Sequence, residues 1–106
     1  MSEHMEHVDV HSFEHTVLGS TEPYLLDFSA VWCPPCRALE PILESLAQEH
    51  RGKLRVGKID IDSSPEVAAR YGVRGAPTLV LFRDGKEVAR RLGLTSKRNL
   101  SQLLGL

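Results

Sequence analysis

The sequence predicts an α/β domain built on a mixed central β-sheet with helices on both faces. Stretches with the periodicity of strands and of helices alternate in the order β-α-β-α-β-α-β-β-α. The early β-α-β crossovers imply parallel strands, whereas Asp84-Gly85 predicts a late antiparallel hairpin. The 106 residues suffice for one domain with its own core, which we expect over residues 8–106.

The N-terminus and the composition narrow the class of protein. Residues 1–7 are polar and rich in His, and we expect them to form a flexible tail without the features of a signal peptide. A net charge of −1 gives no electrostatic reason to expect nucleic acid or a membrane as a partner. No apolar run of the sequence approaches the ~20 residues of a membrane span. We therefore expect a protein of the reducing cytoplasm.

Four histidines near the N-terminus are spaced three and four residues apart: His4, His7, His11 and His15. On one continuous helix this spacing would place them on one face, where they could hold a metal ion. Residues 8–10 alternate like a short strand, however, and would interrupt such a helix. We therefore interpret the histidines as scattered surface residues and expect no metal site.

The elements follow from capping residues and periodicity. Ser12 is the expected N-cap of a short helix that ends at Gly19, with Phe13 and Val17 on one face. Residues 24–28 are apolar on both faces, as in a covered central strand, with Asp27 as the exception. A long helix is expected from Pro34 to Glu49 or His50, with a kink at Pro41, and a shorter helix from Pro65 to Gly72. Further strands are expected over residues 54–60, 78–82 and 87–92. Thr95 or Ser96 is expected to cap the last helix.

Both cysteines lie in Trp32-Cys33-Pro34-Pro35-Cys36, where the central strand passes into the long helix. Two cysteines three residues apart in a first helical turn bring their Cα atoms to ~5.5 Å, which suits a disulfide. The unpaired N–H groups and partial positive charge of a helix N-terminus favour a thiolate. This pattern predicts a dithiol that opens and closes.

Two other interpretations of the cysteine pair stay open at this point. A tetrahedral zinc site needs four ligands, and the sequence has no second cysteine pair. A structural disulfide that closes so short a loop would constrain the unfolded chain little. Both are weaker than the redox-active dithiol.

From about residue 8 to 105 the sequence resembles the thioredoxin family. The likeness rests on several motifs in the same order and at compatible spacings. They are Asp27-Phe28, Trp32-Cys33-x-Pro35-Cys36, Pro41, Val56-Gly57-Lys58-Ile59-Asp60, Tyr71-Gly72-Val73-Arg74-Gly75-Ala76-Pro77-Thr78, Phe82-x-Asp84-Gly85 and Gly93.

This resemblance implies a thioredoxin fold and a role for each site residue. Cys33 would be the nucleophile, more exposed than Cys36, and Cys36 would be the resolving cysteine. Asp27 would be a buried carboxylate that assists proton transfer at Cys36, with Lys58 near it. Such an Asp must be protonated, paired with Lys58 or reached by water.

The resemblance also implies a surface that binds substrates beside the cysteines. Pro77 would follow a cis peptide bond and leave the backbone of Ala76 free to pair with an extended substrate segment. The full set expected to bind substrate is Trp32, Pro34, Pro35, Ala76, Pro77, Gly93 and Leu94.

At three positions the chain departs from the common family pattern. Pro34 replaces a Gly, which removes one N–H from the helix start and stiffens the loop. Ser29 stands where a second Trp is common, and Val31 replaces a common acidic residue. These changes affect the redox potential and the choice of partner.

The function that the resemblance implies is the reduction of protein disulfides. The protein would act as a monomer with no bound cofactor other than the Cys33–Cys36 disulfide, and a flavin-containing thioredoxin reductase would supply electrons. An oxidase or isomerase with a less reducing couple is the first alternative. A metal or iron–sulfur carrier, or a module that only binds protein, is the second.

Overall fold

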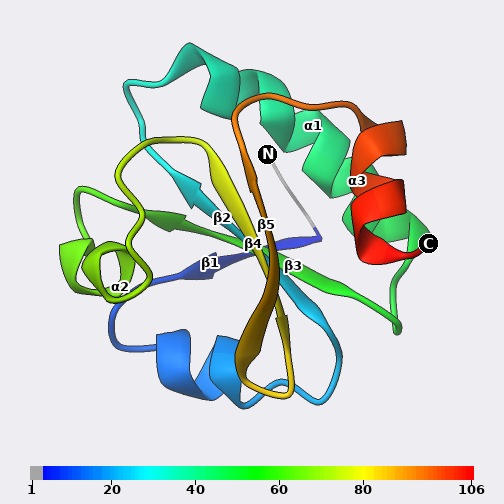
Figure 1. Cartoon of the computed structure of the whole chain (residues 1–106), viewed down its shortest axis with the longest axis horizontal. Coiled ribbons are helices and arrows are strands. Elements are labelled where there is room, and N and C mark those ends of the chain that lie inside the picture. The colour runs from blue at the N-terminus through cyan, green and yellow to red at the C-terminus, as the bar shows by residue number, and fades with distance from the viewer. Residues whose placement is uncertain (1–3) are drawn as a thin grey trace.

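A mixed five-stranded β-sheet forms the centre of the computed structural model, which describes residues 4–106 (Figure 1). The strands are β1 (Met5–Val8), β2 (Tyr24–Ser29), β3 (Arg55–Asp60), β4 (Thr78–Arg83) and β5 (Lys86–Leu92). The helices are the π-type helix η1 (Glu14–Leu18), α1 (Pro34–Glu49), α2 (Pro65–Arg70) and α3 (Lys97–Leu104). Within residues 4–106, none of these helices is long and apolar enough to cross a membrane.

The sheet order is β1-β3-β2-β4-β5. Strands β1 and β2 each pair with β3 in parallel, whereas β4 is antiparallel to both β2 and β5. Asp84 and Gly85 join β4 to β5 with φ angles of 52° and 77°, the positive values that a tight hairpin turn requires. The predicted α/β fold with a mixed sheet is confirmed.

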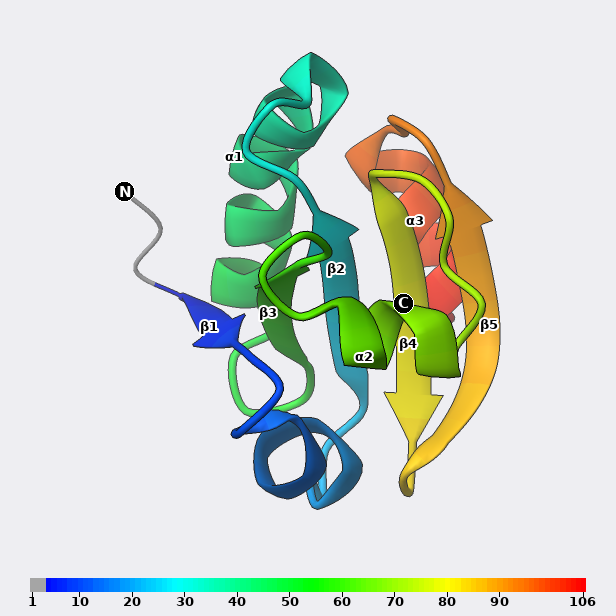
Figure 2. The ribbon, with the colours of Figure 1, turned by 90° about the vertical axis from the view of Figure 1, so that its left-hand side faces the viewer.

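Helices cover both faces of the sheet (Figure 2). One face carries α1 and α3, whose leucines pack with those of β2 and β4 around the fully buried Leu25 and Leu79. The other face carries η1 and α2, which pack around the buried rings of Phe28 and Phe82. Strand β2 lies between the two cores, and all six of its residues are buried.

Strand β1 corrects the expected N-terminal boundary. Met5–Val8 pair with Val56–Ile59 of β3, so the flexible tail predicted over residues 1–7 is wrong from Met5 onward; residues 1–3 lie outside the described part of the chain. The first strand was expected over residues 8–10 and begins three residues earlier, because its polar residues Glu6 and His7 do not have the pattern of a strand. The carboxylate of Glu6 accepts hydrogen bonds from the hydroxyl of Tyr24 (2.7 Å) and the guanidinium of Arg55 (2.9 Å).

The first helix has the expected apolar face and a different start. Phe13 and Val17 are buried, and Gly19 follows the helix. Its N-cap is Phe13, and no side chain within the described residues caps it, so the expected cap by Ser12 is wrong. In the turn before the helix, the Oδ1 atom of Asp9 accepts from the backbone N–H groups of His11 (2.9 Å) and Ser12 (3.0 Å). At α3, the Oγ atom of Ser96 caps the helix by accepting from the N–H of Asn99 at 3.0 Å.

Candidate active site

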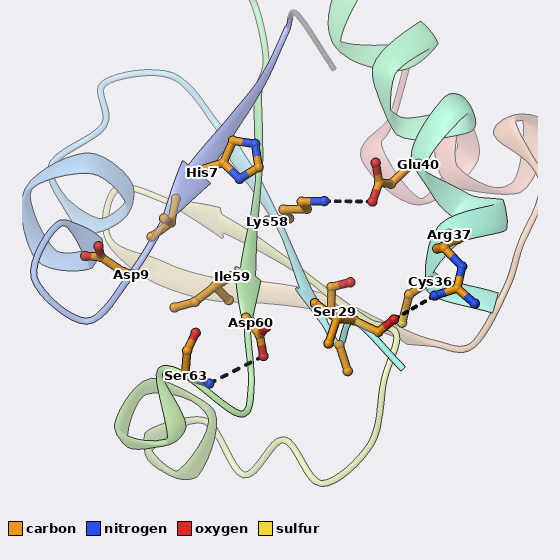
Figure 3. A pocket seen from close by; sticks show the side chains of 13 residues that line it. His7, Asp9, Ser29, Cys36, Arg37, Glu40, Lys58, Ile59, Asp60 and Ser63 are labelled. Carbon is orange, nitrogen blue, oxygen red and sulfur yellow. Dashed lines mark hydrogen bonds and ion pairs between the residues drawn. The ribbon is translucent and has the colours of Figure 1, made fainter. Parts of the chain in front are cut away.

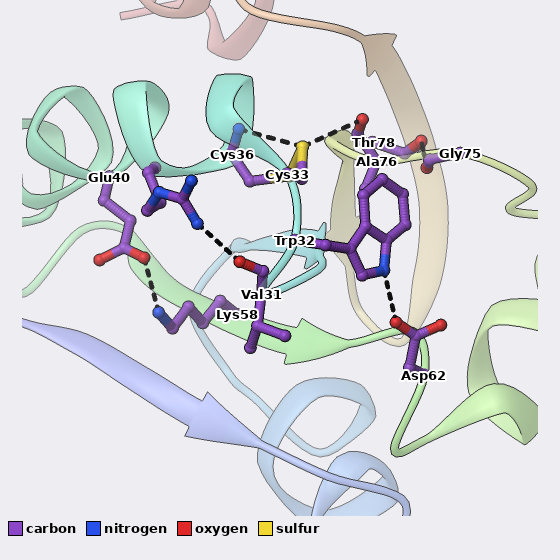
Figure 4. Close-up of a disulfide and its surroundings, with 11 residues drawn as sticks. Val31, Trp32, Cys33, Cys36, Glu40, Lys58, Asp62, Gly75, Ala76 and Thr78 are labelled. Carbon is purple, nitrogen blue, oxygen red and sulfur yellow. Dashed lines mark hydrogen bonds and ion pairs between the residues drawn. A yellow bond between two sulfur atoms is a disulfide. The ribbon is translucent and has the colours of Figure 1, made fainter.

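The Cys33–Cys36 disulfide lies at the N-terminus of α1, beyond the carboxyl end of β2 (Figure 4). Cys33 is the N-cap residue with an extended backbone, and its Sγ atom accepts a hydrogen bond from the N–H of Cys36 at 3.2 Å. Pro34 and Pro35 occupy the first helical positions, where no intrahelical N–H bond is lost. The two Cα atoms are 5.3 Å apart, within the range that a disulfide requires.

The loop before β4 packs against the disulfide. The Sγ atom of Cys33 lies 3.5 Å from the carbonyl oxygen of Ala76, and the peptide bond between Ala76 and Pro77 is cis. Cys33 is only 2 % exposed and Cys36 1 %. Both cysteines are therefore buried in this disulfide form, and the expected difference in exposure between them is very small, because Ala76 packs against Cys33.

An exposed apolar surface surrounds the buried sulfur atoms. Val31 and Trp32 are 75 % and 61 % exposed, and the side chain of Leu94 is exposed as well. The indole N–H of Trp32 donates to a carboxylate oxygen of Asp62 at 2.7 Å, which orients the ring (Figure 4). Of the other residues expected to bind substrate, Pro34 and Pro35 are exposed, Ala76 and Gly93 are half-buried, and Pro77 is buried.

Asp27 is completely buried, and neither of its carboxylate oxygens has a hydrogen-bond partner among residues 4–106. It lies opposite Lys58 in the β2–β3 register, but the Lys58 ammonium group donates to Glu40 of α1 at 2.7 Å. Burial raises the pKa of Asp27 to about 7; the charge of Lys58 lowers it and that of Glu40 raises it. Among the three expected states of Asp27, pairing with Lys58 is not the arrangement found.

A cavity of about 590 Å³ adjoins this group of residues (Figure 3). Cys36, Glu40 and Lys58 line it together with Ser29, whose small side chain leaves the space open. The surface beside Ser29, which was expected to be less bulky, contains a hollow next to Cys36. The other polar residues that line it are His7, Asp9, Arg37, Asp60 and Ser63.

Comparison with known proteins places the chain in a family. The thioredoxin family model matches residues 4–105. The chain belongs to the thioredoxin family. It is 44% identical to the thioredoxin of Pseudomonas aeruginosa and 45% identical to that of Acidithiobacillus ferridurans, in each case over 104 residues that make up 98% of this chain and 96% of the relative. Thioredoxin 1 of a Nostoc species is 43% identical over 93 residues, 88% of this chain and 87% of the relative.

As a thioredoxin with a cysteine pair at disulfide distance, the protein is a thiol–disulfide oxidoreductase and a reductase of protein disulfides. The redox group is the Cys33–Cys36 disulfide itself. Within residues 4–106, no group of three or more His, Cys, Asp or Glu side chains is arranged to hold a metal ion.

Three polar residues of this thioredoxin site were not predicted from the sequence. Glu40 binds Lys58, Asp62 binds Trp32, and the guanidinium of Arg37 donates to the carbonyl oxygen of Val31 at 2.6 Å. Glu40 lies four residues after Cys36, so helical periodicity alone places the two on one face of α1. That spacing was the available signal for Glu40.

Proposed function

We propose that the protein reduces disulfide bonds of other proteins through Cys33 as nucleophile and Cys36 as resolving cysteine. The Cys33 thiolate attacks a target disulfide; the target S–S bond breaks, a mixed disulfide with Cys33 forms, and one target sulfur leaves as a thiolate. Cys36 then loses its proton and attacks the sulfur of Cys33. The mixed disulfide breaks, the Cys33–Cys36 disulfide forms, and the second target thiolate leaves. Two electrons pass to the target, whose two sulfurs take up protons.

The position of Cys33 at the helix N-cap carries this assignment. The N–H of Cys36 points at the Cys33 sulfur, so the same donor stabilises a negative charge on that atom in the dithiol form. Cys36 lies inside the first turn and has no equivalent place at the cap. The helix N-terminus therefore favours the attacking thiolate at Cys33 rather than at Cys36.

Asp27 is the proposed proton acceptor for Cys36. A buried carboxyl group with a pKa of about 7 exchanges its proton readily near neutral pH. Lys58 would modulate that exchange through its charge, because it lies opposite Asp27 in the sheet.

The exposed apolar surface supports a docking site for protein substrates. Trp32, Pro34, Pro35 and Leu94 would contact the target, and the half-buried Ala76 and Gly93 with Pro77 beneath them would form the base. The backbone of Ala76, beside the Cys33 sulfur, would pair with an extended target segment.

The wider setting follows from the same proposal. The protein acts in the cytoplasm as a monomer, receives electrons from a thioredoxin reductase, and passes them to protein disulfides as part of electron transport and cell redox homeostasis. It needs no bound cofactor beyond its own disulfide, and neither nucleic acid nor a membrane is a partner.

Single-cysteine variants test the assignment. With dithiothreitol as the reductant, Cys33→Ser is expected to abolish insulin reduction and to form no mixed disulfide. Cys36→Ser is expected to accumulate a mixed disulfide through Cys33, detected by mass spectrometry, because the resolving thiol is missing. If the Cys33→Ser variant formed a mixed disulfide through Cys36 as fast as Cys36→Ser forms one through Cys33, the assigned roles would be wrong.

The direction of electron flow has its own measurement. Equilibration with a reference dithiol gives the Cys33–Cys36 reduction potential. A value below that of the cytosolic glutathione pool supports the reductase. A value above it would favour the oxidase or isomerase, for which the stiff Pro34 is the observation in favour.

A further inference from the structure

Lys58 is placed in the sheet to face Asp27. Alternate residues of a strand point to the same side, so Asp27 shares the α1 face of β2 with Leu25, and Lys58 shares the α1 face of β3 with Val56. Because Asp27 and Lys58 are also register partners, backbone geometry alone would let the ammonium group reach the carboxylate.

The Lys58 ammonium group is bound by Glu40 and not by Asp27. Glu40 reaches down from α1 and accepts a hydrogen bond from the Lys58 ammonium at 2.7 Å (Figure 3). The Lys58 and Glu40 side chains are 26% and 30% exposed, and both line the cavity beside Cys36, so the ion pair is partly solvated. Asp27, in contrast, is fully buried with no partner among the described residues.

The charged groups that face Asp27 come from two elements. Strand β3 contributes Lys58, and α1 contributes Glu40. Cys36, one turn before Glu40 on α1 and bound in the disulfide, lines the same cavity as these two residues. On the other side β4 places the apolar Leu79 opposite Asp27. The remaining charged or titratable groups around the same cavity are His7, Asp9, Arg37 and Asp60.

We propose that Glu40 is a positioning residue that holds Lys58 away from Asp27 and thereby sets the pH at which Asp27 takes up and releases its proton. With Glu40 in place, the carboxylate of Asp27 lacks a direct counterion, and the neutral acid persists to higher pH. Without Glu40, the Lys58 ammonium is free to turn to its register partner and stabilise the carboxylate. The consequence for catalysis rests on the proposed role of Asp27 as the proton acceptor for Cys36.

The first test is Glu40→Gln, with the protonation of Asp27 followed through its side-chain carboxyl carbon by NMR. We expect the titration midpoint of Asp27 to move down by about one pH unit, since a nearby cation favours the ionised form. The matched control is Glu49→Gln, which removes another glutamate of α1 that pairs with a lysine, Lys97, and which is expected to leave the midpoint unchanged. An unchanged midpoint in Glu40→Gln would overturn the proposal.

A second variant separates the placement of Lys58 from the direct charge of Glu40. In a Lys58→Met background, Glu40→Gln is expected to shift the Asp27 midpoint by less than half of its effect in the native chain. An equal shift in both backgrounds would mean that Glu40 acts by its own charge, and the positioning role would be wrong.

The pH profile of the resolving step distinguishes this proposal from the proposed function. Release of a target from the mixed disulfide is timed in single-turnover experiments with native protein and Glu40→Gln. We expect its pH midpoint to move with that of Asp27. If the Asp27 midpoint moves and the kinetic midpoint does not, the positioning role of Glu40 stands and the role of Asp27 as proton acceptor falls.

Discussion

Asp27 and Lys58 lie directly opposite each other on neighbouring parallel strands, yet the carboxylate of Asp27 has no hydrogen-bond partner within the described part of the chain. An unpaired carboxylate at this depth is costly when ionised and tolerable when protonated. The fold therefore holds a proton on Asp27 more tightly than the unfolded chain does. Stability and proton transfer are linked through this one residue.

The first prediction concerns stability against pH. Because the pKa of Asp27 is raised from its ordinary 3.8 to about 7 in the fold, its contribution is most favourable below about pH 4 and is lost as the pH rises to 7. The full loss is roughly 4 kcal/mol, from about three pH units at ~1.4 kcal/mol each.

Asp27→Asn removes this titration and is compared with the native protein by urea unfolding of the disulfide form. We expect the variant to gain stability relative to the native protein between about pH 5 and pH 8, by a few kcal/mol. Other titrating groups are common to both proteins and cancel. A difference that does not vary with pH would contradict the prediction.

A second prediction concerns Gly57 of β3. A Cβ atom at this position would collide with the hydroxyl of Tyr24, whose ring is fully buried and whose hydroxyl is held by Glu6. Gly57→Ala is expected to lower the free energy of unfolding by about 1–3 kcal/mol, as overpacking does. The matched control is Gly75→Ala, where a Cβ atom meets nothing within 4 Å and the expected change is within about 0.5 kcal/mol. Equal effects of the two substitutions would refute the steric account.

A third prediction concerns the hydrogen bond between Asp62 and Trp32. Asp62→Ala releases the indole ring, which then loses its fixed orientation on the exposed apolar surface. We expect the KM for a protein disulfide to rise roughly fivefold, as the loss of about 1 kcal/mol implies, with kcat unchanged. Glu66→Ala, an exposed acidic residue of α2, serves as the control for loss of charge. A similar KM in both variants would mean that Asp62 does not orient the ring.

A fourth prediction concerns the start of α3. Ser96→Ala removes the hydroxyl that accepts from the N–H of Asn99, and we expect it to cost about 1 kcal/mol in urea unfolding. Ser101→Ala, within the same helix, is the control and is expected to be neutral or slightly stabilising, because Ala is the better helix former. A larger effect of Ser101→Ala would contradict the capping role of Ser96.

Local signals in the sequence were strong enough to predict most of the fold. Two prolines followed by leucines at helical spacing defined α1, and Asp84-Gly85 defined the hairpin, because both patterns depend on neighbouring residues only. The first strand was expected over residues 8–10 and lies instead at Met5–Val8, because its middle residues, Glu6 and His7, are polar. Glu6 becomes acceptable in a strand only through Tyr24 and Arg55, which are far away in the sequence.

The features of the site also fall into those that depend on neighbouring residues and those that depend on residues far away in the sequence. The spacing of Cys33 and Cys36 and the burial of Asp27 follow from one motif and one apolar run. The partner of Lys58 could not be predicted in this way. The sheet register places Lys58 opposite Asp27, whereas the position of α1 over β3 brings Glu40 within hydrogen-bond distance of its ammonium group. The covering of Cys33 by Ala76 likewise depends on a loop 43 residues away.

The parallel register of β1 has a practical consequence for experiments on immobilised or fused protein. Met5 pairs with Val56 near the start of β3, and at the C-terminal end of α3 the carbonyl oxygen of Leu104 accepts from Arg83, the last residue of β4. Since β3 is parallel to β2 and β4 is antiparallel to it, both positions lie at the end of the sheet opposite the carboxyl end of β2, which the disulfide follows. A linker that leaves the fold beside Met5 or Leu104 would thus anchor the molecule to an electrode, a bead or a second protein with its sulfur atoms facing outward.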